Sequence, residues 1–134
     1  MTLIPWIGLD WTRLAQVDLL EERLDITVDR ELRFADEGLD AVARTRYPLI
    51  IVSDVIAPNE LQLPMDIRPD QYGRIGAYVI ENIRESLNSD TPIIAAFYEV
   101  KGYTEKDMYL KAGATEIFPG RPSKMLIEQV QKYL

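Results

Sequence analysis

The chain has 134 residues, of which 47% are apolar and 28% are charged, and its net charge is −7. This size and composition are typical of one globular domain with a core of its own. The chain contains neither Cys nor His, which excludes disulfides, thiolate metal sites and a Ser-His-Asp triad. The acidic charge and the lack of a basic stripe argue against nucleic-acid binding. We therefore expect a protein or a cation as the partner.

Apolar runs are short throughout the chain, and none approaches the roughly 20 residues that a membrane-spanning helix needs. The first eleven residues lack the basic region and long apolar stretch of a signal peptide. These two observations predict a cytoplasmic protein that does not contact membranes.

The first predicted unit is a strand followed by a helix. The apolar run 4–9 predicts the strand, and Asp10 or Thr12 is a suitable N-cap for the helix. The helix carries apolar residues roughly on one face, at Leu14, Val17, Leu20 and Leu24.

The second unit and the third strand follow the same alternation. Residues 26–34 carry a weaker strand signal, and Asp36 is expected to cap a helix that runs to about Thr45. The segment 49–53 is almost continuously apolar, which is typical of a strand buried on both faces of a parallel sheet.

The middle of the chain combines a polar segment with a clearly periodic one. Residues 59–72 are polar and contain two prolines, which predicts a long loop. Residues 73–87 have apolar side chains at four-residue spacing and predict a helix. The apolar run 92–97 predicts the fourth strand.

The C-terminal part completes the pattern. Thr104 and Asp107 resemble a capping box for a helix that ends near Lys111, before the glycine of "AGA". Residues 115–118 predict the last strand. Pro122 and Ser123 open the final helix, which is expected to face inward with Leu126, Val130 and Leu134.

Strands that alternate with helices in this way predict a parallel sheet with helices on both faces. We expect a single domain over residues 1–134, with a loop insertion at about 59–72. In the flavodoxin-like strand order 2-1-3-4-5, functional groups gather at the carboxyl ends of strands one and three. Asp10 ends the first predicted strand and Asp54 follows the third, so this fold brings the two carboxylates close together.

Five motifs in order carry a resemblance to a known family. They are the acidic strand end "IIVSDVIAP", the helix entry "ADEGLDAV", the helix "YGRIGAYVIENIRE", the strand "TPIIAAF" and the segment "AGATEIF". In this order and spacing the chain resembles the CheY-like receiver domain of two-component response regulators. The resemblance implies a three-layer flavodoxin-like fold with five helices and a phosphoacceptor at Asp54. It also implies a Mg²⁺ site formed by Asp10, Asp54 and the backbone carbonyl of Ile56.

Three departures from the family pattern concern the same pocket. Asp10 is a single acid where the family has two adjacent ones, and the switch hydroxyl falls on Phe97, or on Ala96 with a slip of one residue. The family's lysine falls on Gly120, with Arg121 one residue later. Because one carboxylate is missing, we expect Mg²⁺ to bind weakly or not at all. Because Phe97 has no hydroxyl, the usual way of reporting phosphorylation is lost.

Each of these residues also has a simpler interpretation. Asp54 could simply be a carboxylate in a turn, and Asp10 could be an ordinary helix N-cap. Arg121 is then a surface residue near the start of a helix. The loop 59–72 is either a solvated insertion or an element that covers the pocket.

Three functions remain open at this stage. The first is an atypical receiver, or pseudo-receiver, that acts as a signalling protein-interaction module and is not an enzyme. The second is a receiver that accepts a phosphoryl group on Asp54 with Mg²⁺. The third is a flavodoxin-like cofactor binder, which the sparse "GLDWTRLA" segment disfavours because it has little hydroxyl or glycine content for a phosphate loop.

The resemblance also implies the partners and the surface that they use. The partner is expected to be a histidine kinase, an output protein or a second copy of the chain. Partners of typical receivers use the face of the fourth helix, fifth strand and fifth helix, which here comprises 103–111, Ile117 and 125–133.

Overall fold

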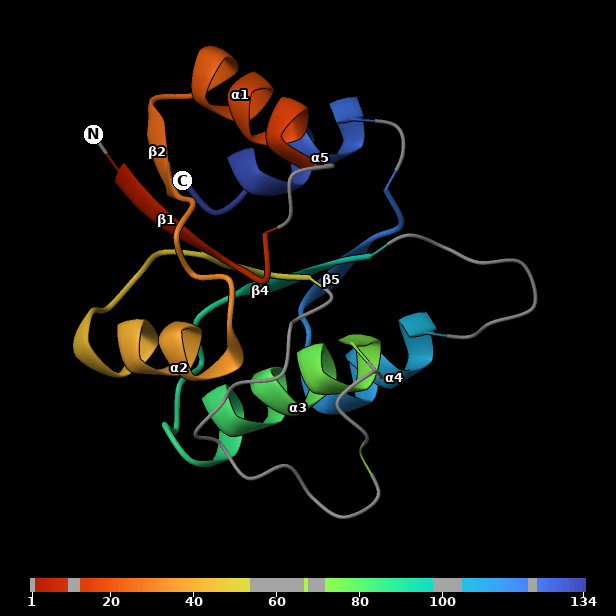
Figure 1. Cartoon of the computed structure of the whole chain (residues 1–134). Helices are drawn as coiled ribbons and strands as arrows, with labels where there is room; N and C mark the ends of the chain where they lie inside the picture. The colour runs from red at the N-terminus through yellow and green to blue at the C-terminus, as the bar shows by residue number, and fades with distance from the viewer. Residues whose placement is uncertain (1, 10–12, 54–66, 68–71, 98–104, 121–122) are drawn as a thin grey trace.

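The computed structural model describes residues 2–9, 13–53, 67, 72–97, 105–120 and 123–134 (Figure 1). The described residues form a five-stranded sheet in the order β2-β1-β3-β4-β5, and all neighbouring strands are parallel. This is the flavodoxin-like order expected from the sequence, and the predicted fold class is confirmed. The strands are β1 Thr2–Ile7, β2 Ile26–Asp29, β3 Ile50–Val52, β4 Ile93–Ala96 and β5 Glu116–Phe118.

Helices cover both faces of this sheet, in three layers overall. In the described part of the chain they are α1 Leu14–Arg23, α2 Ala35–Arg44, α3 Tyr72–Glu85, α4 Glu105–Ala112 and α5 Ser123–Gln131. Helices α1 and α5 lie on one face, and α2, α3 and α4 lie on the other (Figure 1).

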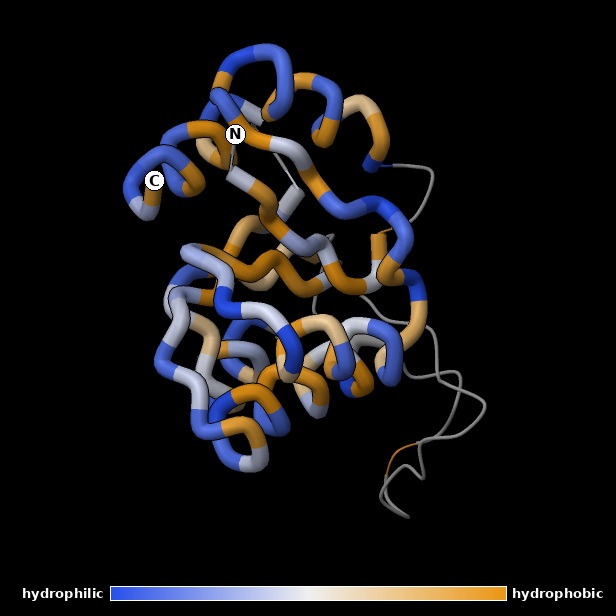
Figure 2. The backbone as a smooth tube through the Cα atoms, turned by 90° about the vertical axis from the view of Figure 1, so that its left-hand side faces the viewer, coloured by the Kyte–Doolittle hydropathy of each residue, from blue (hydrophilic) through white to orange (hydrophobic). Residues whose placement is uncertain are grey.

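The central strand β3 explains why two helical layers form. Its side chains alternate between the faces, so Ile50 and Val52 pack towards α2, α3 and α4, whereas Leu49 and Ile51 pack towards α1 and α5. All four side chains are buried. Figure 2 shows the apolar strands gathered in the middle of the molecule, between the two layers of helices.

Several predicted boundaries differ from the structure. β1 begins at Thr2, two residues before the predicted start, and β2 ends at Asp29 instead of near residue 34. The predicted cap at Asp36 is wrong, because α2 begins at Ala35 with Phe34 at its N-cap position. The carboxylate of Glu37 accepts a hydrogen bond from the Phe34 backbone N–H at 3.2 Å. Asp36 instead lies in the first turn, where its negative charge suits the helix dipole.

The predicted inward position of Leu134 is wrong, and Leu14 is the more exposed end of the predicted apolar face of α1. Leu134 is 51% exposed, because α5 ends at Gln131 and the helical spacing no longer applies beyond it. Leu14 is 38% exposed at the first turn of α1, whereas Val17 and Leu20 in the same helix are buried.

Other predictions fall outside the described residues. These are the caps at Asp10, Thr12 and Thr104, the start at Pro122, and the loop 59–72 apart from Ile67 and Tyr72. Among the residues that the structure describes, no helix is long and apolar enough to cross a membrane.

Arg84 near the end of α3 hydrogen-bonds to the segments that precede β4 and β5, at the amino-terminal edge of the sheet. Its Nη1 donates to the carbonyl oxygens of Thr91 at 2.6 Å and Ser89 at 3.2 Å, and its Nε donates to that of Gly113 at 2.9 Å. Nη2 reaches the Thr115 hydroxyl at 3.2 Å. Burial lowers the pKa of this guanidinium, against the opposing effect of Asp90. One side chain therefore joins α3 to the segments that lead into β4 and β5.

We expect Arg84→Lys and Arg84→Ala each to lower the free energy of unfolding by about 2–3 kcal/mol, because neither side chain can satisfy carbonyls in several directions. Urea unfolding monitored by circular dichroism measures this. Arg44→Ala is the matched control, since Arg44 also lies in the last turn of its helix but forms only an exposed ion pair with Asp40. Equal stability of the Arg84 and Arg44 variants would contradict the role of Arg84.

Candidate functional site

The carboxyl ends of β1, β3, β4 and β5 meet at one edge of the sheet, and backbone hydrogen bonds extend the pairing past the strand ends. The Ser53 N–H donates to the Ile7 carbonyl at 2.9 Å, just beyond β3. The Phe97 N–H donates to the Phe118 carbonyl at 3.0 Å, just beyond β4. We call this region the carboxyl edge. In open parallel sheets it is where ligands bind.

Ser53 is the last described residue before Asp54, and its buried side chain is fully engaged. The Ser53 hydroxyl donates to the Gly8 carbonyl at 2.8 Å, and the indole N–H of Trp6 donates to the same hydroxyl at 3.2 Å. Gly8 adopts a φ of 82°, which favours glycine, and its N–H donates to the Leu32 carbonyl at 2.7 Å. These bonds hold the end of β3 beside the turn after β1.

Gly76 allows α3 to approach the end of β3 closely. A Cβ atom built at Gly76 would lie 2.6 Å from the Ser53 carbonyl oxygen and 3.3 Å from the Tyr109 hydroxyl. A contact of 2.6 Å with a backbone atom is too short for any side chain. The absence of a side chain at position 76 therefore sets how near α3 lies to the carboxyl edge.

Phe97 directly follows β4 and is 2% exposed. The ring stacks on Tyr109 of α4, with ring centroids 5.2 Å apart and an angle of 25° between the planes. This stacked geometry joins β4 to α4 through apolar contact. An aromatic ring offers no hydrogen bond to a phosphoryl oxygen, and Ala96 before it has no hydroxyl either.

A buried positive charge lies between the turn after β1 and the turn after β5. Arg13, at the N-cap position of α1, is 2% exposed. Its Nη1 donates to the side-chain oxygen of Gln16 at 3.2 Å, and the Gln16 side-chain nitrogen donates to the Gly120 carbonyl at 3.1 Å. Gly120 adopts a φ of 95°. This chain of contacts ties the start of α1 to the position where the resemblance places the family's lysine.

The residues predicted to form the pocket are only partly described. Phe97 and Gly120 lie at the carboxyl edge, just beyond the neighbouring strands β4 and β5. Asp10, Asp54, Ile56 and Arg121 lie outside the described residues, and so whether they converge stays a prediction. In the described ranges, no group of three or more acidic side chains is close enough to share a metal ion.

Sequence reasoning missed Arg13, Ser53 and Trp6. In the sequence Arg13 is an ordinary polar residue at the start of a helix, and only its tertiary contacts show that it is buried. For Ser53, the available signal was its place between an apolar run and Asp54. The partners of its hydroxyl come from β1 and the turn after it, more than 40 positions earlier in the chain.

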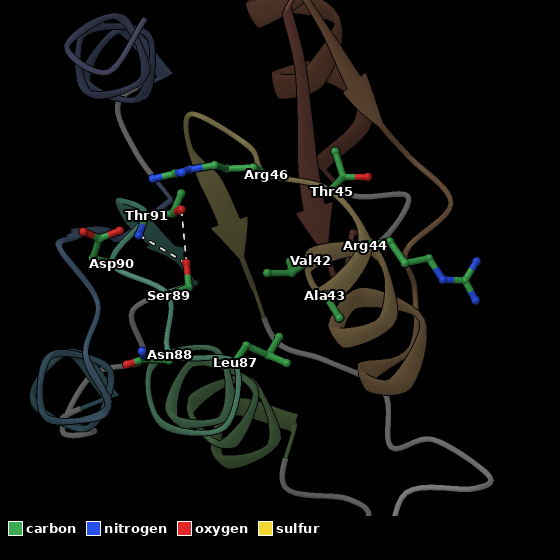
Figure 3. A pocket seen from close by; sticks show the side chains of 10 residues that line it. All are labelled: Val42, Ala43, Arg44, Thr45, Arg46, Leu87, Asn88, Ser89, Asp90 and Thr91. Atoms are coloured by element: carbon green, nitrogen blue, oxygen red, sulfur yellow. Dashed lines mark hydrogen bonds between the residues drawn. The ribbon is translucent and has the colours of Figure 1, made fainter.

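A cavity of about 460 Å³ lies at the opposite edge of the sheet, between the segments that lead into β3 and β4 (Figure 3). Its lining includes Arg46 and Asp90, both exposed, and Arg44 points away from Asp90 in Figure 3. Ser89 and Thr91 hydrogen-bond to each other there at 3.1 Å. This open, polar groove contains charges of both signs and no buried ionised group, and so we place the candidate site at the carboxyl edge.

No protein-family model and no curated protein sequence matches the chain. Its structure is similar to that of the chemotaxis protein CheY4 of Vibrio cholerae, with a TM-score of 0.67 and 17% identity over 100% of this chain and 99% of that one. A two-component response regulator from Clostridium difficile gives a TM-score of 0.69 and 17% identity, covering 99% of this chain and 95% of that one. The chain therefore has the fold of CheY-like receiver domains, as its motifs indicated.

A further similar structure contains a metal ion. It is the receiver domain of a sensor histidine kinase from Pseudomonas aeruginosa, with a magnesium ion coordinated in its active-site cleft. Its TM-score is 0.65 and its identity 16%, over 98% of this chain and 96% of that one.

The described residues at the carboxyl edge of this chain do not fit Mg²⁺ well. Mg²⁺ prefers oxygen ligands that include carboxylates. Here the Ser53 hydroxyl is engaged with Trp6 and Gly8, and the buried ionised group is the Arg13 guanidinium. The predicted ligands Asp10, Asp54 and Ile56 lie outside the described residues, and so weak or absent Mg²⁺ binding stays a prediction.

We expect Gly76→Ala to lower the free energy of unfolding by about 1–3 kcal/mol, although alanine normally stabilises a helix by about 1 kcal/mol relative to glycine. The added Cβ must push α3 away from the Ser53 carbonyl. Urea unfolding measures the change. Glu81→Ala, at an exposed position of the same helix, is the control and should have little effect. A stabilised Gly76→Ala variant would show that α3 does not depend on this close approach.

Proposed function

We propose that this chain is an atypical receiver domain that acts as a signalling module through protein contacts, without the hydroxyl switch of the family. The observation that carries the proposal is Phe97, which is buried at the end of β4 and stacked on Tyr109. In this position the side chain stabilises one arrangement of β4 and α4 by packing. It has no polar group that could respond to a phosphoryl group nearby.

The surface formed by α4, β5 and α5 is the proposed docking face. Leu110 of α4 is 45% exposed, which is unusual enough for a large apolar side chain to suit a protein contact. The β5 and α5 part of the face carries a polar cluster, in which Lys132 and Tyr133 both donate hydrogen bonds to Glu116. The bond to Glu116 raises the pKa of Tyr133, and so the phenol stays protonated and keeps its role as a donor. A histidine kinase, an output protein or a second copy of this chain is the proposed partner.

A second candidate function is acceptance of a phosphoryl group on Asp54. The observation that favours it is the rigid end of β3, where the Ser53 side chain and N–H are both held by the turn after β1. In such a reaction with acetyl phosphate, a carboxylate oxygen of Asp54 bonds to phosphorus while the bond from phosphorus to the acetate oxygen breaks and acetate leaves. No observation favours the third function, a flavodoxin-like cofactor binder.

We expect the mass of the intact protein to stay unchanged after incubation with acetyl phosphate and Mg²⁺, because the sequence has a single acid, Asp10, where the family pattern has two adjacent ones. Mass spectrometry measures this. Asp54→Ala is the reference for the acceptor position, and Asp90→Ala is a control at an exposed acid on the opposite edge. An added phosphoryl group that disappears only in Asp54→Ala would overturn the degenerate pocket and support the second function.

We expect Leu110→Asp to shift the equilibrium between one and two copies towards the single chain, because a charge at the docking face disfavours apolar contact. Light scattering across a concentration series measures the mass. Leu14→Asp is the matched control, since Leu14 is a similarly exposed leucine on a helix of the other face. If the dimer persists in Leu110→Asp but is lost in Leu14→Asp, the chain self-associates through the α1 side and not through the proposed docking face.

A further inference from the structure

The outer side of β2 is the starting point, because the open edge of a sheet can pair with a strand of another molecule. β2 is the last strand on one side of the sheet, and in the described part of the chain it pairs with β1 alone. Residues 26–28 are Ile-Thr-Val, three β-branched residues that favour strand formation. An edge with this composition pairs readily with a second strand unless something covers it.

The outward N–H groups of β2 are already bonded within the chain. Alternate residues of an edge strand direct their backbone groups towards the neighbouring strand and away from it. The N–H of Ile26 donates to the Leu24 carbonyl at 2.9 Å, and the N–H of Val28 donates to the Glu21 carboxylate at 2.9 Å. Neither partner belongs to β1, and so Ile26 and Val28 are the residues that face outward. A side chain of α1 therefore stands where the carbonyl of an added strand would bind Val28.

Arg30, just after β2, holds the Glu21 carboxylate in this position. Arg30 donates to one carboxylate oxygen of Glu21, and the Val28 N–H donates to the other. Arg30 also donates to Asp18 of the same helix at 2.7 Å. The bond from Val28 is the largest cause that lowers the pKa of Glu21, with Arg30 acting in the same direction and burial opposing it. The carboxylate therefore stays ionised and keeps accepting from the strand edge.

Pairing of β2 with another strand requires this contact to break. A hydrogen bond from an N–H to a carboxylate is stronger than one to the neutral carbonyl that an added strand offers. Its loss also leaves the partly buried charges of Glu21 and Arg30 less well paired. A second copy is the strand donor that matters here, since its own β2 carries the same sequence and the same edge.

We propose that Glu21 and Arg30 form an edge guard, which closes the outer side of β2 and prevents this chain from pairing with a second copy through its sheet. The edge guard goes beyond the proposed function, because β2 lies at the opposite end of the sheet from β5 of the docking face. It restricts contacts between copies to helix-covered surfaces such as that face.

The test is self-association, measured by light scattering across a concentration series. Every sample carries Leu110→Asp, so that the proposed docking face does not contribute. We expect Glu21→Ala to lower the concentration at which copies associate by roughly tenfold. Glu21→Gln keeps a side-chain oxygen that can accept from Val28 and should remain a single chain. Glu22→Ala is the matched control, because it removes the same charge from the next position of α1, which is exposed.

Two further measurements locate the contact between copies. Adding Thr27→Lys to Glu21→Ala should reverse the association, because Thr27 is exposed on β2 and a lysine at a strand edge opposes pairing. Hydrogen exchange followed by nuclear magnetic resonance should show a Val28 amide that exchanges faster in dilute Glu21→Ala and is protected again as the concentration rises. Arg30→Met removes the residue that holds Glu21, and it tests the edge guard if Glu21→Ala does not fold.

The edge guard is overturned if Glu21→Ala associates no more readily than Glu22→Ala, or if Thr27→Lys leaves its association unchanged. Either result leaves the interaction module standing, because the docking face is tested by Leu110→Asp against Leu14→Asp. Conversely, a failure of the docking face has no bearing on the edge guard, since Leu110→Asp is present in every sample.

Discussion

The structure depends on one constraint, which is the burial of β3 on both faces. Water reaches neither side of Leu49 to Val52, so each backbone N–H and C=O must find a partner in a neighbouring strand. β1 and β4 provide these partners, and the two faces must each be covered by helices. The strand order and the two helical layers are the arrangement that meets both demands at once.

The same constraint determines where chemistry is feasible. The strand delivers Ser53 to the edge of the sheet where the carboxyl ends of β1, β3, β4 and β5 lie, and a hydrogen bond to the Gly8 carbonyl holds it there. The described side chains at this edge are mostly buried, among them Trp6, Arg13 and Phe97. The ring of Phe97 stacks on Tyr109, and Gln16 links the buried Arg13 to the Gly120 carbonyl. These contacts join β4 to α4 and the start of α1 to the end of β5.

Much of this architecture was predictable, because periodic apolar patterns report directly on burial. The five strand and helix pairs, the parallel sheet and its order were all expected from such patterns and from the motifs. Boundaries were less predictable. Phe34 at the start of α2 and the exposure of Leu134 depend on where a helix begins or ends, and that depends on neighbouring segments. The convergence of Asp10 and Asp54 remains a prediction.

The sequence by itself determined the fold class and the location of the candidate site, because alternating strands and helices pack in few ways and "LIIVSD" leads a buried strand to its carboxyl edge. Only the tertiary structure decided which side chains meet at that edge. Trp6 reaches Ser53 across 47 positions and Gln16 reaches Gly120 across 104. No local pattern encodes such contacts, since they arise when distant segments pack against each other. For the same reason, the burial of Arg13 became evident only in the folded chain.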